Sequence, residues 1–183
     1  MALLKSINVQ LGTKAIDFCL KGIDGAMHSL ADYDAKDVLV IVIMCNHCPY
    51  VHAVDDRLVL LQEKFAERNV QLVGINPNDG IKYPDDNFEN MVKRAKEKGY
   101  NFPYLRDEDQ SIAKKYQAQC TPDIYVYNKE RELCYHGQID DNWQHPEKVT
   151  SHDLSDAIEA LLGGGKPSPD QYPSMGCSIK WKE

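Results

Sequence analysis

The chain has 183 residues and a formal net charge of −7, and its composition is that of a soluble globular protein with one hydrophobic core. The acidic balance excludes a nucleic-acid-binding face, because such a face needs clustered lysine and arginine. The longest apolar run, Val38 to Met44, is too short to cross a membrane, and MALLKSINVQLG at the start has no apolar signal segment. We therefore expect a cytoplasmic protein that binds neither nucleic acid nor membrane.

The first half of the chain predicts alternating strands and helices. Residues 15–30 indicate two short strands around a turn at Gly22–Gly25, and residues 37–44 form a β-branched run typical of a strand buried on both faces. Residues 49–69 repeat apolar side chains every three or four positions, which predicts one long amphipathic helix. Residues 70–76 predict a second buried strand, parallel to the first across a helical crossover.

The second half predicts further helices and a hairpin. We expect a turn-rich loop at residues 76–87, a charged helix at 88–98 and a short strand at 101–107. A short helix at 110–117, a hairpin at 123–137 and a final helix at 151–163 follow. Ser151 is the expected N-cap of the final helix, and glycines end it. The remaining residues predict an ordered or semi-ordered tail. This order of elements predicts an α/β sandwich with a central mixed β-sheet flanked by helices.

Two of the six cysteines lie close together, in the segment IVIMCNHCPYV. Cys45 lies where a buried strand ends and a helix begins, so its sulfur would face the positive end of the helix dipole. Such a position lowers a cysteine pKa from about 8.5 into roughly the 3.5–7.5 range. Cys48 follows one helical turn later, at the spacing that a reversible disulfide needs. His47 adds a donor or a positive charge beside the thiolate.

The pair also has other interpretations. A structural zinc site needs four ligands, and Cys45, Cys48 and His52 would need a fourth from elsewhere, so we expect no metal and no cofactor. Copper delivery would use the same three residues. Cys19 and Cys134 lie on expected strands and are predicted to be buried, inert thiols.

A Thr-Pro pair lies directly before the predicted hairpin strand. Pro122 lies 77 positions after Cys45 in the chain (122 − 45), and Thr121 immediately precedes it. A proline just before a strand removes a donor and can support a cis bond. Cys120 precedes this pair and should lie near the two cysteines. Cys177, in the tail, could resolve a sulfenate if the tail folds over them.

A C-x-x-C-P motif at a strand-to-helix junction, with Thr-Pro ahead of a hairpin strand, resembles the thioredoxin fold. The whole chain further resembles a peroxiredoxin-like group of the alkyl hydroperoxide reductase/thiol-specific antioxidant superfamily, in MCNHCPYV, GINPND, YPDD, FPYLRDEDQ, CTPDIYVY, YHGQIDD and PSMGCSIKW. The resemblance implies a thioredoxin-like three-layer sandwich in one domain. Its expected parts are an N-terminal strand extension (1–35), a core (36–163) with an insertion around 76–98, and the tail (164–183). It also implies that Thr121 and Pro122 dock the backbone of a substrate.

The sequence departs from the related families at informative positions. Cys45 and Ile41 occupy the threonine and proline positions of a peroxidatic P-x-x-x-T-x-x-C motif, so the residues that activate peroxide are missing. Leu39 occupies the position of the buried acid of thioredoxins, so a water, His47 or another carboxylate must accept the second proton. Met44 stands where thioredoxins place tryptophan. His47 before the second cysteine resembles the C-x-H-C of disulfide oxidases and isomerases.

The predicted function is thiol–disulfide exchange in cell redox homeostasis. Cys45 would attack a substrate disulfide as a thiolate, and Cys48 would then release the reduced substrate. The substrate would be a disulfide-containing protein or a small thiol compound, a separate reductant would close the cycle, and the protein would be a monomer or a weak homodimer. The alternatives are a thiol-dependent peroxidase with Cys120 or Cys177 as the resolving thiol, and a metal-binding protein on the same fold.

Overall fold

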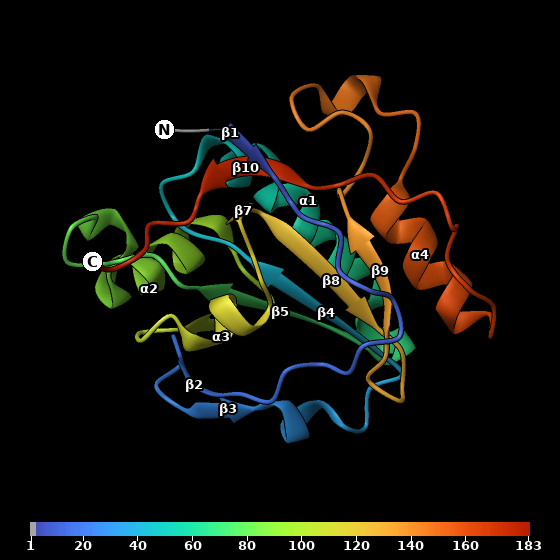
Figure 1. The fold of residues 1–183 in the computed structure, drawn as a ribbon, viewed down its shortest axis with the longest axis horizontal. Helices are drawn as coiled ribbons and strands as arrows, with labels where there is room; N and C mark the ends of the chain where they lie inside the picture. The colour runs from blue at the N-terminus through green and yellow to red at the C-terminus, as the bar shows by residue number, and fades with distance from the viewer. Residues whose placement is uncertain (1–2) are drawn as a thin grey trace.

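The computed structural model describes residues 3–183, and its centre is a mixed sheet of seven strands (Figure 1). The strands are β2 (Cys19–Gly22), β3 (Met27–Ser29), β4 (Val38–Ile43), β5 (Val70–Asn76), β6 (Tyr104–Arg106), β8 (Asp123–Tyr127) and β9 (Leu133–Gly137). Their order is β3-β2-β6-β5-β4-β8-β9. β5 is parallel to β4 and β6, whereas β8 and β9 form an antiparallel hairpin on the other side of β4. The predicted mixed sheet is confirmed.

Helices cover both faces of this sheet. They are α1 (Pro49–Phe65), α2 (Phe88–Lys98), α3 (Ser111–Lys115) and α4 (Asp153–Leu162), with 3-10 turns η1 (Leu30–Tyr33), η2 (Ala66–Arg68), η3 (Pro84–Asp86) and η4 (Pro146–Lys148). Successive side chains of β4 point to opposite faces. Val40 and Val42 pack in one buried cluster with α1, α2 and α4, whereas Ile41 and Ile43 pack in the other with α3 and the N-terminal segment. The three-layer arrangement is therefore confirmed.

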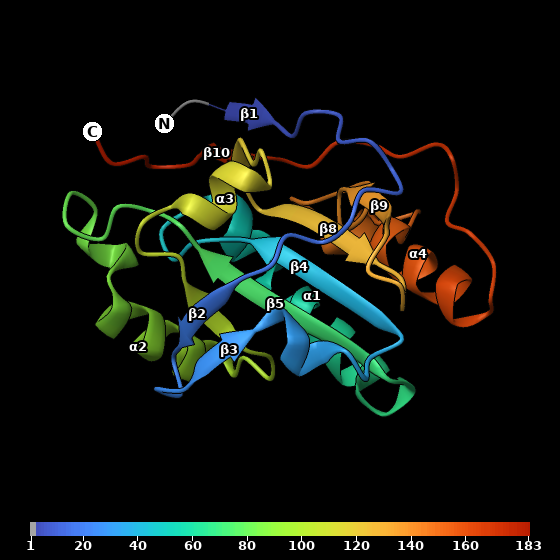
Figure 2. The ribbon, with the colours of Figure 1, turned by 60° about the horizontal axis from the view of Figure 1, so that its bottom comes forward.

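A small second sheet joins the two ends of the chain to its middle. Its strands are β1 (Leu3–Lys5), β10 (Met175–Ser178) and β7 (Cys120–Thr121), in the order β1-β10-β7. Figure 2 shows the C-terminal segment, in red, running along one edge of the molecule from α4 through β10. The sequence predicted an ordered or semi-ordered tail but no strand there, because a four-residue strand has little periodicity and its partners lie far away in the chain.

Three local expectations need correction or completion. His152, and not Ser151, holds the N-cap position of α4, where it makes no side-chain capping hydrogen bond. The Ser151 hydroxyl donates to the Asp153 carboxylate. Cys19 lies on strand β2 as expected but is exposed, because β2 pairs near the sheet edge. Cys134 is half-buried. Within residues 3–183, every helix is too short or too polar to cross a bilayer.

Candidate active site

A short loop connects the carboxyl end of β4 to the amino end of α1, and it carries the two close cysteines. α1 begins at Pro49, where its missing N–H costs nothing, and Cys48 is the N-cap residue. Asn46 holds the loop in place. Its side-chain nitrogen Nδ2 donates to the Asp85 carbonyl oxygen at 2.7 Å, and its side-chain oxygen accepts from the Tyr104 hydroxyl at 3.0 Å. The cysteines therefore lie in a fixed loop.

Both sulfurs contact the residue that precedes a cis-proline. The Thr121–Pro122 peptide bond is cis. The Cys45 Sγ lies 3.2 Å from the Thr121 hydroxyl oxygen, and the Cys48 thiol donates to the Thr121 carbonyl oxygen at 3.1 Å. The structure thus brings Cys45, Cys48, Thr121 and Pro122 together, although they are separated by more than 70 positions in the chain.

A third thiol reaches the same place from the C-terminal strand. β10 runs antiparallel to β7, with Cys177 directly opposite Thr121. Cys48 and Cys177 belong to the same packed cluster of buried side chains. All three cysteines are buried: Cys45 is 1% exposed, Cys48 0% and Cys177 4%. They form one buried group at β10, the strand that carries Cys177. We call them the thiol cluster.

The neighbouring groups, with Cys45 first among them, favour the thiolate of Cys48 and not that of Cys45. Hydrogen bonds from the side chains of Cys45 and Cys177 and from the amide of Val51 outweigh the burial of Cys48 and lower its pKa to about 4. Burial, the hydrogen bond to Cys48 and the charge of Asp86 raise the pKa of Cys45. The expected lowering of the Cys45 pKa is therefore wrong, because these effects oppose its thiolate more strongly than the helix dipole favours it.

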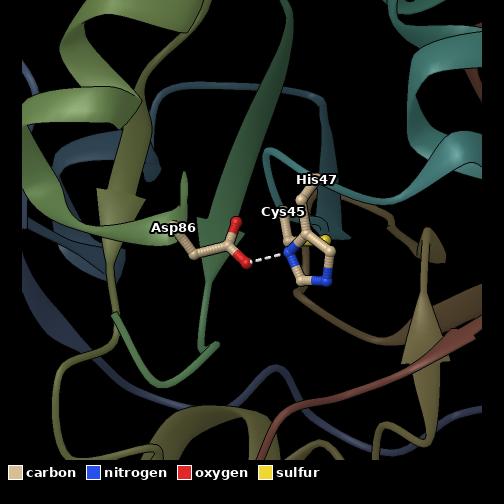
Figure 3. Close-up of side chains that lie close together, drawn as sticks. All are labelled: Cys45, His47 and Asp86. Carbon is tan, nitrogen blue, oxygen red and sulfur yellow. Dashed lines mark hydrogen bonds and ion pairs between the residues drawn. The ribbon is translucent and has the colours of Figure 1, made fainter. Parts of the chain in front are cut away.

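A buried carboxylate lies on the other side of the thiol cluster. His47 Nδ1 forms a hydrogen bond and ion pair with Asp86, and these two residues and Cys45 lie close together in Figure 3. Asp86 is fully buried, at the end of η3, and also accepts from the Asn46 amide at 2.6 Å and the Asn78 side chain at 2.9 Å. The Asp86 hydrogen bond raises the pKa of His47. Burial opposes ionisation of Asp86, but these hydrogen bonds outweigh it and lower its pKa.

Asp86 was missed by the sequence interpretation. It lies in YPDD, within a loop in which several acids follow one another, and only the missing acid at Leu39 signalled that another carboxylate was needed. The His47 side chain is 15% exposed and stacks on Tyr83, with ring centroids 5.7 Å apart. His47 therefore connects the buried acid to solvent.

The same residues offer the one set of metal ligands found among the described residues. Ligand atoms of Cys45, His47 and Asp86 lie within 4.8 Å of one another. A fourth ligand would be needed for a structural zinc site. The His52 Nε2 bonds to the Asn46 carbonyl oxygen instead, so the set of Cys45, Cys48 and His52 considered from the sequence does not form through that nitrogen.

Cys120 lies beside the thiol cluster without joining it. It is buried on β7, its sulfur lies 3.8 Å from the Pro122 carbonyl oxygen, and burial raises its pKa. A cavity of about 300 Å³ opens on the other side of the cis-proline. Its walls include Tyr50, Pro122, Trp143 and Met175, and the rings of Tyr50 and Trp143 are 4.3 Å apart. The cavity gives apolar side chains of a ligand a place next to the helix start.

Comparison with known proteins agrees with this geometry. The family model described as the AhpC/TSA family matches residues 11–136. No protein among those with curated descriptions matches the chain. An uncharacterised conserved protein from Geobacillus kaustophilus is 42% identical, with a TM-score of 0.94 over 100% of this chain and 97% of that one. A hypothetical protein from Sinorhizobium meliloti 1021 is 38% identical, with a TM-score of 0.93 over 97% and 98%.

A more distant structure identifies the fold. The thioredoxin domain of a thiol-disulfide oxidoreductase from Bacteroides vulgatus is 14% identical, with a TM-score of 0.62 over 77% of this chain and 97% of that one. At this identity the likeness is one of fold, and the predicted thioredoxin-like fold is confirmed.

Proposed function

Since the chain belongs to the AhpC/TSA family, which gives it a thiol-based redox function, we propose that it is a thiol–disulfide oxidoreductase that acts through Cys48 and Cys45. The observation that carries this proposal is the contact of both sulfurs with Thr121, immediately before cis-Pro122. Two thiols that lie in one buried cluster can exchange a disulfide without any further group.

The lowered pKa of Cys48 makes it the attacking sulfur. Its thiolate attacks one sulfur of a substrate disulfide, the substrate S–S bond breaks, and the second substrate sulfur leaves and takes a proton. Cys45 then loses its proton and attacks the sulfur of Cys48, which forms the Cys45–Cys48 disulfide. The bond from Cys48 to the first substrate sulfur breaks, and that sulfur leaves and takes up the proton. An external dithiol reduces this disulfide and closes the cycle.

His47 assists the second step, and Asp86 contributes by keeping His47 protonated. Cys45 holds its proton in the reduced protein partly because of its hydrogen bond to Cys48. Once Cys48 is in a mixed disulfide, its negative charge is gone, and the protonated His47 then favours the Cys45 thiolate. This pair takes the place of the buried acid that is absent at Leu39.

The test is reduction of insulin disulfides by dithiothreitol, followed with single variants. We expect Cys48→Ser to lower the catalysed rate by at least about 100-fold, because it removes the nucleophile. The double variant Cys45→Ser/Cys177→Ser should retain a mixed disulfide on Cys48, because both neighbouring thiols are gone. Cys19→Ser, at an exposed sulfur far from the site in the sheet, is the control. Wild-type activity in Cys48→Ser would exclude this function.

A thiol peroxidase is the second candidate, and the N-cap position of Cys48 with a neighbouring Cys177 favours it. Its hydroperoxide substrate would oxidise Cys48 to a sulfenic acid. The thiol of Cys177 or Cys45 would then condense with this sulfenic acid to form a disulfide and release water. Stopped-flow measurement distinguishes the two functions. A rate of hydrogen peroxide consumption well above that of free thiols would favour the peroxidase, and a rate like that of free thiols would remove it.

A further inference from the structure

Strand β10 occupies the edge at which an extended substrate would dock. The backbone before the cis-proline is β7, and β10 is its antiparallel neighbour, with Cys177 opposite Thr121 and Ser178 opposite Cys120 (Figure 1). Addition of an extended segment to a free strand edge is a common mode of peptide recognition. In this protein the C-terminal segment itself is that added strand.

The fit between the two strands is close. A Cβ atom on Gly176 would lie 1.9 Å from the Thr121 carbonyl oxygen, so only glycine allows this approach. The strand is held at both ends: the Ser174 hydroxyl donates to the Gly137 carbonyl oxygen at 2.6 Å, and the Lys180 amide donates to the Asn78 side chain at 2.8 Å. These contacts fix β10 in its position beside the site.

This fit brings Cys177 and Cys48 to the same residue, Thr121. The Thr121 carbonyl oxygen that faces Gly176 is also the one 3.1 Å from the Cys48 Sγ. Cys177 belongs to the same buried cluster as Cys45 and Cys48. The sulfur of a docked substrate would have to reach the same place, opposite Thr121.

We propose that Cys177 is a third redox-active thiol, which forms a disulfide with Cys48 while β10 is paired with β7. This inference rests on the function proposed above. Starting from the Cys45–Cys48 disulfide, the Cys177 sulfur attacks Cys48, the Cys45–Cys48 bond breaks, and Cys45 leaves as the thiol. The proton of Cys177 passes to Cys45, and no electrons enter or leave, because one disulfide replaces another.

The exchange has a consequence for access to the site. With the Cys48–Cys177 disulfide formed, β10 is tied covalently over β7, and an external substrate cannot add a strand there. Reduction of this disulfide frees β10 to leave. Cys177 therefore holds the position of a substrate cysteine within the same chain and competes with an external disulfide for Cys48.

The experiment uses the full-length variant Cys45→Ser, which leaves only Cys48 and Cys177 in the cluster. The reduced variant is treated with oxidised glutathione, free thiols are blocked with N-ethylmaleimide, and the protein is digested with trypsin. Cleavage after Lys36, Arg57 and Lys180 leaves Cys48 and Cys177 on separate peptides. We expect these two peptides linked by a disulfide, with glutathione released. Glutathione retained on Cys48, with Cys177 alkylated, would overturn the proposal.

Matched variants separate chemistry from folding. Cys45→Ser/Cys120→Ser changes a buried thiol in the same strand pairing and should still give the linked peptides. Cys45→Ser/Gly176→Ala keeps every remaining thiol but displaces β10, and should slow the linking at least about tenfold, because the sulfurs are no longer held together. An unchanged rate in this variant would overturn the role of β10.

Failure of this inference is distinguishable from failure of the proposed function. Insulin reduction by the wild-type protein tests the function, whereas the peptide map tests Cys177. Activity on insulin without any linked peptides would overturn only the third thiol. Linked peptides in a protein inactive on insulin would overturn the function and keep the Cys48–Cys177 pair.

Discussion

The thiol cluster has two flanks of opposite character. On one flank, Asp86 and His47 present a buried carboxylate and an imidazole that is 15% exposed. On the other, β7 and β10 present backbone groups and a neutral thiol, Cys177, closed off from solvent. The first flank acts through charge and the second through contact. The protonation of the thiols and the access of a substrate to them are therefore controlled by different segments. These segments come from distant parts of the chain.

This separation means that each flank can be changed while the other stays intact. Asp86 comes from η3, in the loop after β5, whereas Cys177 comes from the C-terminal strand. We call the Asp86 and His47 side the charged flank and the β7 and β10 side the strand flank. A variant on the charged flank should change how stability depends on pH and leave the alkylation of buried thiols unchanged. A variant on the strand flank should change the alkylation of buried thiols and leave the pH dependence of stability unchanged.

The largest effect should come from Asp86→Asn. Asp86 accepts hydrogen bonds from His47, from the Asn46 amide and from Asn78, and an amide can satisfy only part of this set. Breaking a buried charge pair in this way should lower the free energy of unfolding by about 3 kcal/mol. Urea denaturation under reducing conditions measures it.

Asp85→Asn is the matched control, since its side chain is exposed and next in the sequence. Its effect should stay within about 0.5 kcal/mol. Equal effects of the two substitutions would mean that the buried acid has no structural role, and the contrast between the flanks would not hold.

The second prediction concerns the strand flank. Gly176→Ala forces a methyl group against the Thr121 carbonyl oxygen, so β10 must leave its register. We expect the free energy of unfolding to fall by about 2 kcal/mol and the buried cysteines to react faster with iodoacetamide. Gly163→Ala, whose Cβ would meet nothing closer than 3.4 Å, is the control. Unchanged alkylation of Cys48 would show that β10 does not cover it.

The core of the fold was predictable from the sequence, but its edges were not. The β-branched run at 38–43 and the helix repeat that begins at Pro49 define their elements by local patterns, and the structure confirms both. β10 has no such pattern, because its pairing depends on one glycine and on β7, which lies more than 50 positions earlier. Long-range pairing of short strands leaves little trace in local sequence.

The same limit applies to the site. The C-x-x-C motif and the Thr-Pro pair are short patterns, and the structure brings them together. Asp86 was missed because nothing near it in the sequence indicates that a loop after β5 returns to the cysteines. The order of the thiols also differed from expectation. The helix starts at Pro49 as predicted, but burial, the neighbouring Cys48 and the charge of Asp86 raise the pKa of Cys45 before it.

The smallest predicted effect is also the most specific to the charged flank. The hydrogen bond with Asp86 raises the pKa of His47 above its unfolded value of about 6.5. Stabilisation by protonated His47 is therefore complete below about pH 6.5 and is lost as the pH rises through the raised pKa. Because the pKa of Asp86 is lowered, its own contribution is complete above about pH 4 and is lost as the pH falls through that lowered value.

His47→Gln keeps a hydrogen-bonding side chain but removes the charge. At pH 5.5 the variant should be less stable than the wild type by about 1 kcal/mol, the difference between a charged and a neutral hydrogen bond, and this difference should shrink by pH 9. Urea denaturation at both pH values measures it. His145→Gln, at a surface histidine whose side chain is 48% exposed, should show almost no difference at either pH. A difference for His47→Gln that stays constant between the two pH values would mean that the imidazole stabilises the loop by packing on Tyr83, and the charged flank would then consist of Asp86 alone.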